Sequence, residues 1–137
     1  MKLVLDTWVL VEQYKGNPYS SKIIRSSDRH ELIISHITIA ELINVIARQY
    51  GQKEARIQYA YIKNLPFSKI ATNEMIAKDA GFYKTRYKFS LADAFILSTA
   101  VNTGADALIT GGAKQFKEEW SDVSEVDVMP LEDFYSR

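Results

Sequence analysis

Short apolar runs alternate along this chain with longer stretches of helical periodicity, and that alternation limits the possible folds more than any other feature. Five runs have the length of buried strands: Lys2–Leu5, Glu31–Ile34, Phe67–Ile70, Ala107–Thr110 and Val126–Met129. The stretches between them are predicted to be helices: Thr7–Tyr14, Thr38–Tyr50, Lys53–Asn64, Asn73–Tyr87, Leu91–Asn102 and a short one at Ala113–Glu119. Strands that alternate with helices form a parallel sheet covered on both faces. We therefore predict an α/β fold, a three-layer α/β/α sandwich with a central, mostly parallel sheet.

Length and composition restrict the class of protein further. The chain of 137 residues suits one domain with its own core, which we assign to residues 1–137. Lys plus Arg and Asp plus Glu both number 17, so binding to nucleic acid or an anionic membrane must use local patches. The lack of cysteine excludes disulfides, thiolate zinc sites and a cysteine nucleophile. The sequence shows no signal-peptide pattern and no apolar run long enough to span a membrane. We therefore expect a soluble, cytoplasmic protein without membrane association.

Three carboxylates occupy equivalent places in the predicted sheet. Asp6 directly follows the first strand, Glu41 falls in the first turn of the helix after the second strand, and Asp93 falls in the first turn of the helix "LADAFILSTA". In an open parallel sheet, ligands bind outside the carboxyl ends of the strands, where the strand-to-helix turns meet. We therefore expect the three acids to lie together at one edge of the sheet.

Each acid also has a purely structural interpretation. Thr38-x-x-Glu41 and Ser90-x-x-Asp93 both fit the capping box, and Asp6 could cap the helix that follows it. Asp93 fits this interpretation least, because its helix is apolar almost all round and an unpaired buried carboxylate is costly. Gathered carboxylates would also repel one another, and a bound Mg²⁺ or Mn²⁺ resolves both problems.

Four blocks of the sequence resemble, in order and spacing, those of the PIN-domain ribonucleases, and in particular the VapC-type toxins of prokaryotic toxin–antitoxin pairs. The blocks are "LVLDTWVLVE", "ITIAELINVIAR", "FSLADAFILSTA" and "GADALITGGAKQF". The resemblance implies an endoribonuclease in which Asp6, Glu41 and Asp93 hold Mg²⁺ or Mn²⁺ and carry catalysis. It also implies an RNA substrate, a cognate antitoxin protein and a homodimer. The alternative is a degenerate PIN domain with a weakened metal site that mainly binds RNA or protein.

One position departs from the family pattern. Members commonly carry a fourth acid just after the last block's strand, in a Thr-x-Asp pattern, but here Gly112 takes the acid's place after Thr110. Neither Asp106, before that strand, nor Glu118 and Glu119, in the following helix, is predicted to lie well for replacing it. The missing acid favours one loosely held ion over two. The glycine pair itself is interpreted as a plain turn, as amides facing a phosphate, or as a position that requires positive φ.

Hydroxyl groups next to the acids are candidates for holding them in place. Thr7 follows Asp6, and Thr110 ends the fourth predicted strand. Side chains that hydrogen-bond to metal ligands orient them and tune the metal. Thr7 is equally interpreted as an ordinary first-turn residue, and Thr110 as an ordinary strand end.

Cations that could contact RNA are concentrated in one segment. "YKTRYKF" interleaves Lys84, Arg86 and Lys88 with aromatic rings, and RNA binding needs both positive charge and stacking surface. The structural alternative is that the cations favour a helix C-terminus and the rings face the core. Arg48 lies seven residues after Glu41 and is predicted either to neutralise it or to touch a phosphate.

Two other acidic-pocket classes are excluded by the residues after Asp6. A receiver domain needs paired acids after its first strand, and a haloacid-dehalogenase-like phosphatase needs Asp-x-Asp. Thr7 and Trp8 stand there instead.

The two helices between the second and third predicted strands carry more apolar surface than one layer requires, which predicts a partner surface. In the second of them, Ile57, Tyr61 and Leu65 are predicted as the core stripe, with Tyr59 and Ile62 beside it. The alternative is a monomer whose tyrosine rings pack while their hydroxyls stay in water.

Overall fold

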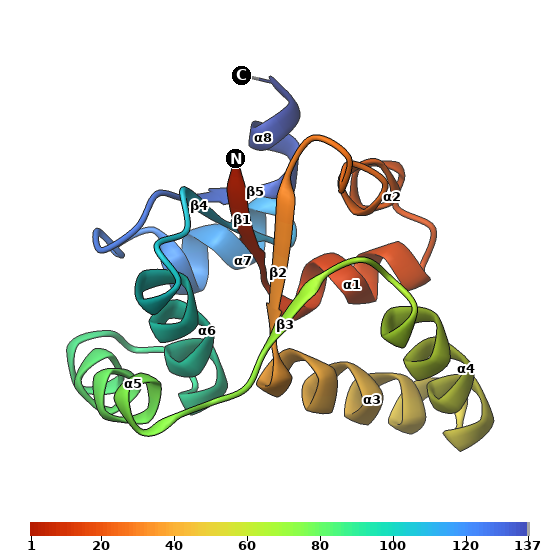
Figure 1. Cartoon of the computed structure of the whole chain (residues 1–137), viewed down its shortest axis with the longest axis horizontal. Coiled ribbons are helices and arrows are strands. Elements are labelled where there is room, and N and C mark those ends of the chain that lie inside the picture. Colours follow the sequence, from red (N-terminus) through yellow and green to blue (C-terminus); the bar gives the residue numbers. More distant parts are fainter. Residues whose placement is uncertain (137) are drawn as a thin grey trace.

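A five-stranded sheet forms the centre of the computed structural model, which describes residues 1–136 (Figure 1). Its strands are β1 (Lys2–Leu5), β2 (Glu31–Ser35), β3 (Ser68–Ile70), β4 (Ala107–Thr110) and β5 (Val128–Pro130). Every neighbouring pair is parallel, in the order β3-β2-β1-β4-β5. The predicted α/β fold with a parallel sheet is confirmed. Arg137, the last residue of the predicted domain, lies outside the described residues.

Helices fill the connections between the strands, and two of them were not predicted from the sequence. The helices are α1 (Thr7–Tyr14), α2 (Pro18–Ile24), α3 (His36–Tyr50), α4 (Gln52–Lys63), α5 (Glu74–Arg86), α6 (Leu91–Asn102), α7 (Ala113–Gln115), the π-helix η1 (Phe116–Trp120) and α8 (Leu131–Ser136). The two additional helices are α2 and α8. Asn17 starts α2, because its side-chain oxygen accepts the backbone N–H groups of Tyr19 and Ser20, and Pro18 occupies the first helical position.

Each face of the sheet is covered by its own apolar cluster, so the molecule has three layers. Leu3 and Leu5 point into a cluster with α1, α2, α3 and α4, while Val4 points into a second cluster with α5, α6 and Trp120. Figure 1 shows the first group of helices on one side of the sheet and α5 and α6 on the other. This alternation is what a strand buried on both faces requires. Within residues 1–136, no helix is both long and apolar enough to cross a membrane.

The predicted core stripe of α4 is wrong. Ile57 and Tyr61 are 54% and 39% exposed, whereas Ile62, predicted to lie beside the stripe, is 1% exposed. The buried positions of α4 are Ala55, Gln58 and Ile62. The sequence does not indicate this buried face, because Gln58 is polar. Gln58 is nevertheless buried, and its amide donates to the side-chain oxygen of Gln13 at 3.3 Å.

Two isoleucines on α4 provide a matched test of this assignment. Ile62→Ala should lower the free energy of unfolding by about 2–5 kcal/mol, because it leaves a cavity in the core. Ile57→Ala should change it by less than about 0.5 kcal/mol, since Ile57 is exposed on the same helix. Urea denaturation at low protein concentration measures both, and equal losses would contradict the assignment.

Candidate active site

The three acids singled out in the sequence come together at the carboxyl edge of the sheet. Asp6 follows the central strand β1 and is 1% exposed, Asp93 lies in the first turn of α6 and is 7% exposed, and Glu41 is half-buried on α3. β1 lies between β2 and β4, where the winding of the sheet reverses, which is the usual binding crevice of an open parallel sheet. The three carboxyl groups lie close enough to act on one another's ionisation.

Asp6 is the most deeply buried of the three. The side-chain amide of Gln115 donates to Asp6 Oδ2 at 2.8 Å, but Asp6 Oδ1 is buried without a hydrogen-bond partner. Asp6 precedes α1 yet makes no side-chain capping bond, so the capping interpretation is wrong for this residue. Burial, together with the charge of Glu41, raises the pKa of Asp6 to about 7 even though the bond from Gln115 lowers it.

Glu41 is held by Thr7. The Thr7 hydroxyl donates to Glu41 Oε1 at 2.5 Å. The predicted capping box with Thr38 does not form, because α3 begins at His36 and its cap is Ser35, which places Glu41 beyond the first turn. Burial raises the pKa of Glu41, with a further contribution from the negative charge of Glu119.

Asp93 combines a structural and an electrostatic role. The Ser90 hydroxyl oxygen accepts the backbone N–H of Asp93, so the cap of α6 forms as the sequence predicts. The Asp93 carboxyl group nevertheless lies among other acids on a helix that is almost entirely buried. Burial, and then the charges of Asp6 and Glu119, raise the pKa of Asp93 to about 8.

Glu119 joins this group, so the prediction that it lies badly is wrong. It lies within hydrogen-bonding reach of Asp93, and its charge also acts on Asp6 and Glu41. The adjacent Trp120 is fully buried against Phe89, with ring centroids 5.3 Å apart, and Phe89 directly precedes the cap of α6. This aromatic contact brings η1 to the start of α6.

No local sequence signal identified Glu119. Gln115 stands four residues before it, but the bond from Gln115 to Asp6 is visible only in the tertiary structure.

The glycine pair after β4 shapes the edge of the site. A Cβ on Gly111 would lie 2.8 Å from Trp8 Cβ, so only glycine allows this close approach. Gly112 has a φ of −73°, which any residue adopts, so the positive-φ explanation for it is wrong. A Cβ built on Gly112 would have ordinary van der Waals contact with Glu132 Oε1, at 3.7 Å, so a side chain could be accommodated at this position.

The structure places the predicted hydroxyl and cationic groups in different surroundings. Thr110 Oγ1 lies 3.5 Å from the carbonyl oxygen of Met129 on β5. Arg48 is exposed, and the ion pairs among the described residues do not include one between Arg48 and Glu41. The prediction that Arg48 neutralises Glu41 is therefore wrong. Lys84 is exposed on α5.

A cavity of about 380 Å³ lies next to Glu119 and collects the other predicted cations. Arg86, Lys88 and Lys117 line it together with the acids Glu118, Glu119 and Asp122. Arg86 is paired with Glu125, and Glu125 also accepts the Tyr87 hydroxyl at 2.5 Å. Lys88 and Lys117 are exposed.

The donor set fits a hard divalent cation. Four carboxyl groups are gathered, one has a buried oxygen without a partner, and their mutual repulsion favours a compensating positive charge. In the part of the chain that is described, no three acid or histidine side chains converge into a ready-made metal site. Gln115 and Thr7 instead hold two of the carboxyl groups in the arrangement seen here.

Comparison with known proteins relates this geometry to a family. Residues 3–119 match the family described as PIN domain, whereas no curated protein sequence matches the chain. The DNA-bound VapBC of Salmonella typhimurium is similar in structure, with a TM-score of 0.75 and 17% identity over 96% of this chain and 98% of that chain.

Two further solved structures are similar to the chain. A toxin–antitoxin complex of Klebsiella pneumoniae gives a TM-score of 0.64 and 23% identity over 91% of this chain and 98% of that one. A sarcin–ricin-loop-cleaving VapC toxin of Mycobacterium tuberculosis gives 0.66 and 14% over 77% and 86%. These likenesses confirm the predicted PIN-like fold.

The buried acids predict an unusual pH dependence of the metal-free protein. The pKa values of Asp6 and Asp93 are raised from 3.8 to about 7 and about 8, so the folded protein holds more protons than the unfolded chain between these limits. Stability should therefore fall as the pH rises from about 4 to about 8. Asp93→Asn should match the wild type near pH 4 and exceed its melting temperature at pH 8. Thermal unfolding in EDTA measures the difference, and parallel curves for the two proteins would contradict the assignment.

Proposed function

The chain belongs to the PIN-domain family, and from this premise we propose that it is a metal-dependent endoribonuclease, the toxin of a VapBC-type toxin–antitoxin pair. The observation that carries the proposal is the group of four carboxyl groups at the carboxyl end of β1, with Asp6 Oδ1 buried and unpartnered. An isolated carboxylate this deeply buried is expensive. Such a group is retained where a cation balances it.

Asp6, Glu41 and Asp93 would hold Mg²⁺ or Mn²⁺. Glu119 would supply the fourth carboxyl group, since Gly112 occupies the position of the family's fourth acid. The bound ion would lower the pKa of a water molecule and offset charge on the phosphoryl oxygens. Gln115 and Thr7 orient Asp6 and Glu41 through hydrogen bonds of 2.8 and 2.5 Å.

RNA is the proposed substrate because cations lie directly beside the acids. Lys88 and Lys117 line the cavity next to Glu119, and both ammonium groups are available to phosphates. Arg86 contributes less free charge, since it is paired with Glu125. The fold is shared with the VapC toxin of Mycobacterium tuberculosis that cleaves the sarcin–ricin loop.

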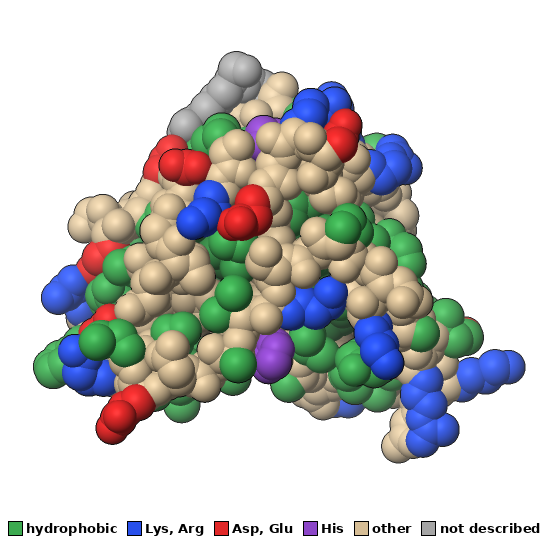
Figure 2. All heavy atoms as spheres, in the orientation of Figure 1, with side chains coloured by type: hydrophobic (Ala, Val, Ile, Leu, Met, Phe, Trp, Pro, Cys, Tyr) green, Lys and Arg blue, Asp and Glu red, His purple; other side chains and the backbone are tan. Residues whose placement is uncertain are grey.

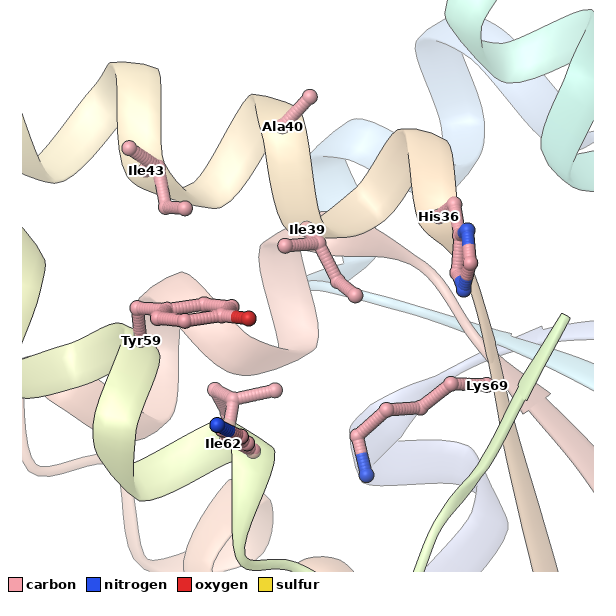
Figure 3. Close-up of a pocket in the computed structure, with 8 residues that line it drawn as sticks. His36, Ile39, Ala40, Ile43, Tyr59, Ile62 and Lys69 are labelled. Carbon is pink, nitrogen blue, oxygen red and sulfur yellow. The ribbon is translucent and has the colours of Figure 1, made fainter. Parts of the chain in front are cut away.

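An antitoxin segment is the proposed occupant of an apolar groove between α3 and α4. The groove has a volume of about 480 Å³, and Ile39, Ile43, Tyr59 and Ile62 face one another across it (Figure 3). Ala40, which precedes Glu41 in the chain, lines this groove, and we propose that the occupant extends from there along α3 toward the acids.

The rim of this groove is basic. Lys63 and Lys69 line one end, and Arg48, Lys53 and Arg56 are exposed on the same two helices. Figure 2 shows Lys and Arg side chains gathered at the lower right, over the α4 corner of the molecule. An apolar segment flanked by acidic residues complements such a surface.

Metal binding and cleavage test the proposed activity together. Calorimetric titration should show that Mn²⁺ binds the wild type, that Asp93→Asn and Glu119→Gln weaken binding, and that Glu118→Gln does not. Glu118 is the matched control, since it is exposed next to Glu119. Cleavage of single-stranded RNA should require Mg²⁺ or Mn²⁺ and fall by about a hundredfold or more in Asp93→Asn.

Two outcomes would contradict this assignment. Failure of millimolar Mn²⁺ to bind or stabilise the wild type would remove the metal site. Metal binding without RNA cleavage would favour the degenerate PIN domain that mainly binds a partner.

A homodimer is proposed to form through the exposed apolar face of α4. Ile57 and Tyr61 stand one turn apart and are 54% and 39% exposed, more than a monomer's solvent face needs. Light scattering across a concentration range should give a dimeric mass that Ile57→Glu reduces toward a monomer. A strictly monomeric wild type at high micromolar concentration would leave the dimer without support.

A further inference from the structure

A second open cleft also borders the acids. Its volume is about 520 Å³, and its wall includes Trp8 together with Lys114, Gln115 and Glu119. Gln115 donates to Asp6 and Glu119 lies beside Asp93, so this wall is continuous with the acidic group. Glu118 and Glu119 line the first cavity as well. The two clefts therefore share these acids but differ in their other residues, which include exposed lysines in the first and an exposed indole in the second.

Trp8 is a solvent-open aromatic surface in this cleft. It lies in the first turn of α1, two residues after Asp6, and is 38% exposed, whereas Trp120 is fully buried. Gly111 approaches its Cβ so closely that a larger residue at position 111 would collide with it, which keeps the two segments together. An indole open to solvent beside the acids is a ready stacking surface for a planar ring.

The charges around Trp8 select a base over a phosphate. Glu12, Glu118 and Glu119 line the cleft, against the single ammonium group of Lys114. Such a surface repels phosphates more than the first cavity does, since Lys88 and Lys117 there offset part of the negative charge of Glu118, Glu119 and Asp122. An uncharged base has no such penalty, and its aromatic face matches the indole.

We propose that Trp8 stacks a base of single-stranded RNA next to the cleavage position, while the adjoining phosphates contact Lys88 and Lys117. This inference rests on the proposed ribonuclease function and adds a binding subsite to it. Sequence-specific and sequence-tolerant RNA binding both use splayed bases stacked on aromatic side chains. Trp8 binds substrate in this arrangement and takes no part in the chemical step.

Fluorescence isolates the proposed contact because the chain has only two tryptophans. Subtracting the emission of Trp8→Phe from that of the wild type isolates Trp8 and leaves the buried Trp120 in place. Titration with single-stranded phosphorothioate RNA, which resists cleavage, in Mg²⁺ should quench the Trp8 emission. An unchanged emission under conditions where labelled RNA binds by anisotropy would overturn the proposal.

Binding measurements on variants supply the second arm. Trp8→Ala should raise the Kd for RNA on the order of tenfold, and Trp8→Phe should retain most of the affinity, since a phenyl ring also stacks. Phe82→Ala is the matched control, because Phe82 is 65% exposed on α5 and lines neither cleft. In cleavage assays Trp8→Ala should raise KM with little change in kcat.

The outcomes separate this inference from the function on which it rests. Equal RNA affinity of Trp8→Ala and an actively cleaving wild type would overturn the stacking proposal and leave the ribonuclease intact. A wild type that neither binds nor cleaves RNA would overturn both. A loss of dimeric mass in Trp8→Ala by light scattering would assign Trp8 to a subunit contact and also overturn the stacking proposal.

Discussion

The burial of a carboxyl group at the end of the central strand is the constraint on which the rest of the site depends. Asp6 follows β1, which is flanked by β2 and β4 and covered on both faces, so water reaches its side chain only from the carboxyl edge. One of its oxygens has no partner. Such a group is tolerated where a proton or a cation compensates its charge, and Glu41, Asp93 and Glu119 raise that need further.

The elements around Asp6 are arranged to position this costly group. Gln115 donates a hydrogen bond to Asp6 from α7. Thr7, the residue after Asp6, donates one to Glu41. The packing of Trp120 on Phe89 fixes η1 against the start of α6, so a purely apolar contact sets the distance between two acids. Apolar packing in the core thus offsets the repulsion between the gathered carboxyl groups. Functional sites commonly carry such a local destabilisation.

The surroundings of the acids are asymmetric, and this asymmetry suits a polymeric substrate. Lys88 and Lys117 line one cavity, Trp8 lines the other cleft, and Glu118 and Glu119 line both. A nucleic acid strand alternates a charged backbone with planar uncharged bases, and the two surfaces complement these two parts separately. The apolar groove between α3 and α4 is a third surface, distinct in chemistry from both.

The sequence by itself determined the parallel α/β fold, the place of Asp6 at a strand end and of Asp93 at a helix start, and the cap at Ser90, because strand length, helical period and capping are local properties. The tertiary structure alone decided that Glu119 joins the acids, because the Trp120–Phe89 contact joins segments far apart in the chain. It also decided which face of α4 is buried, since Gln58 is satisfied only by a distant Gln13. Short-range patterns report which residues prefer burial, but long-range packing chooses their partners.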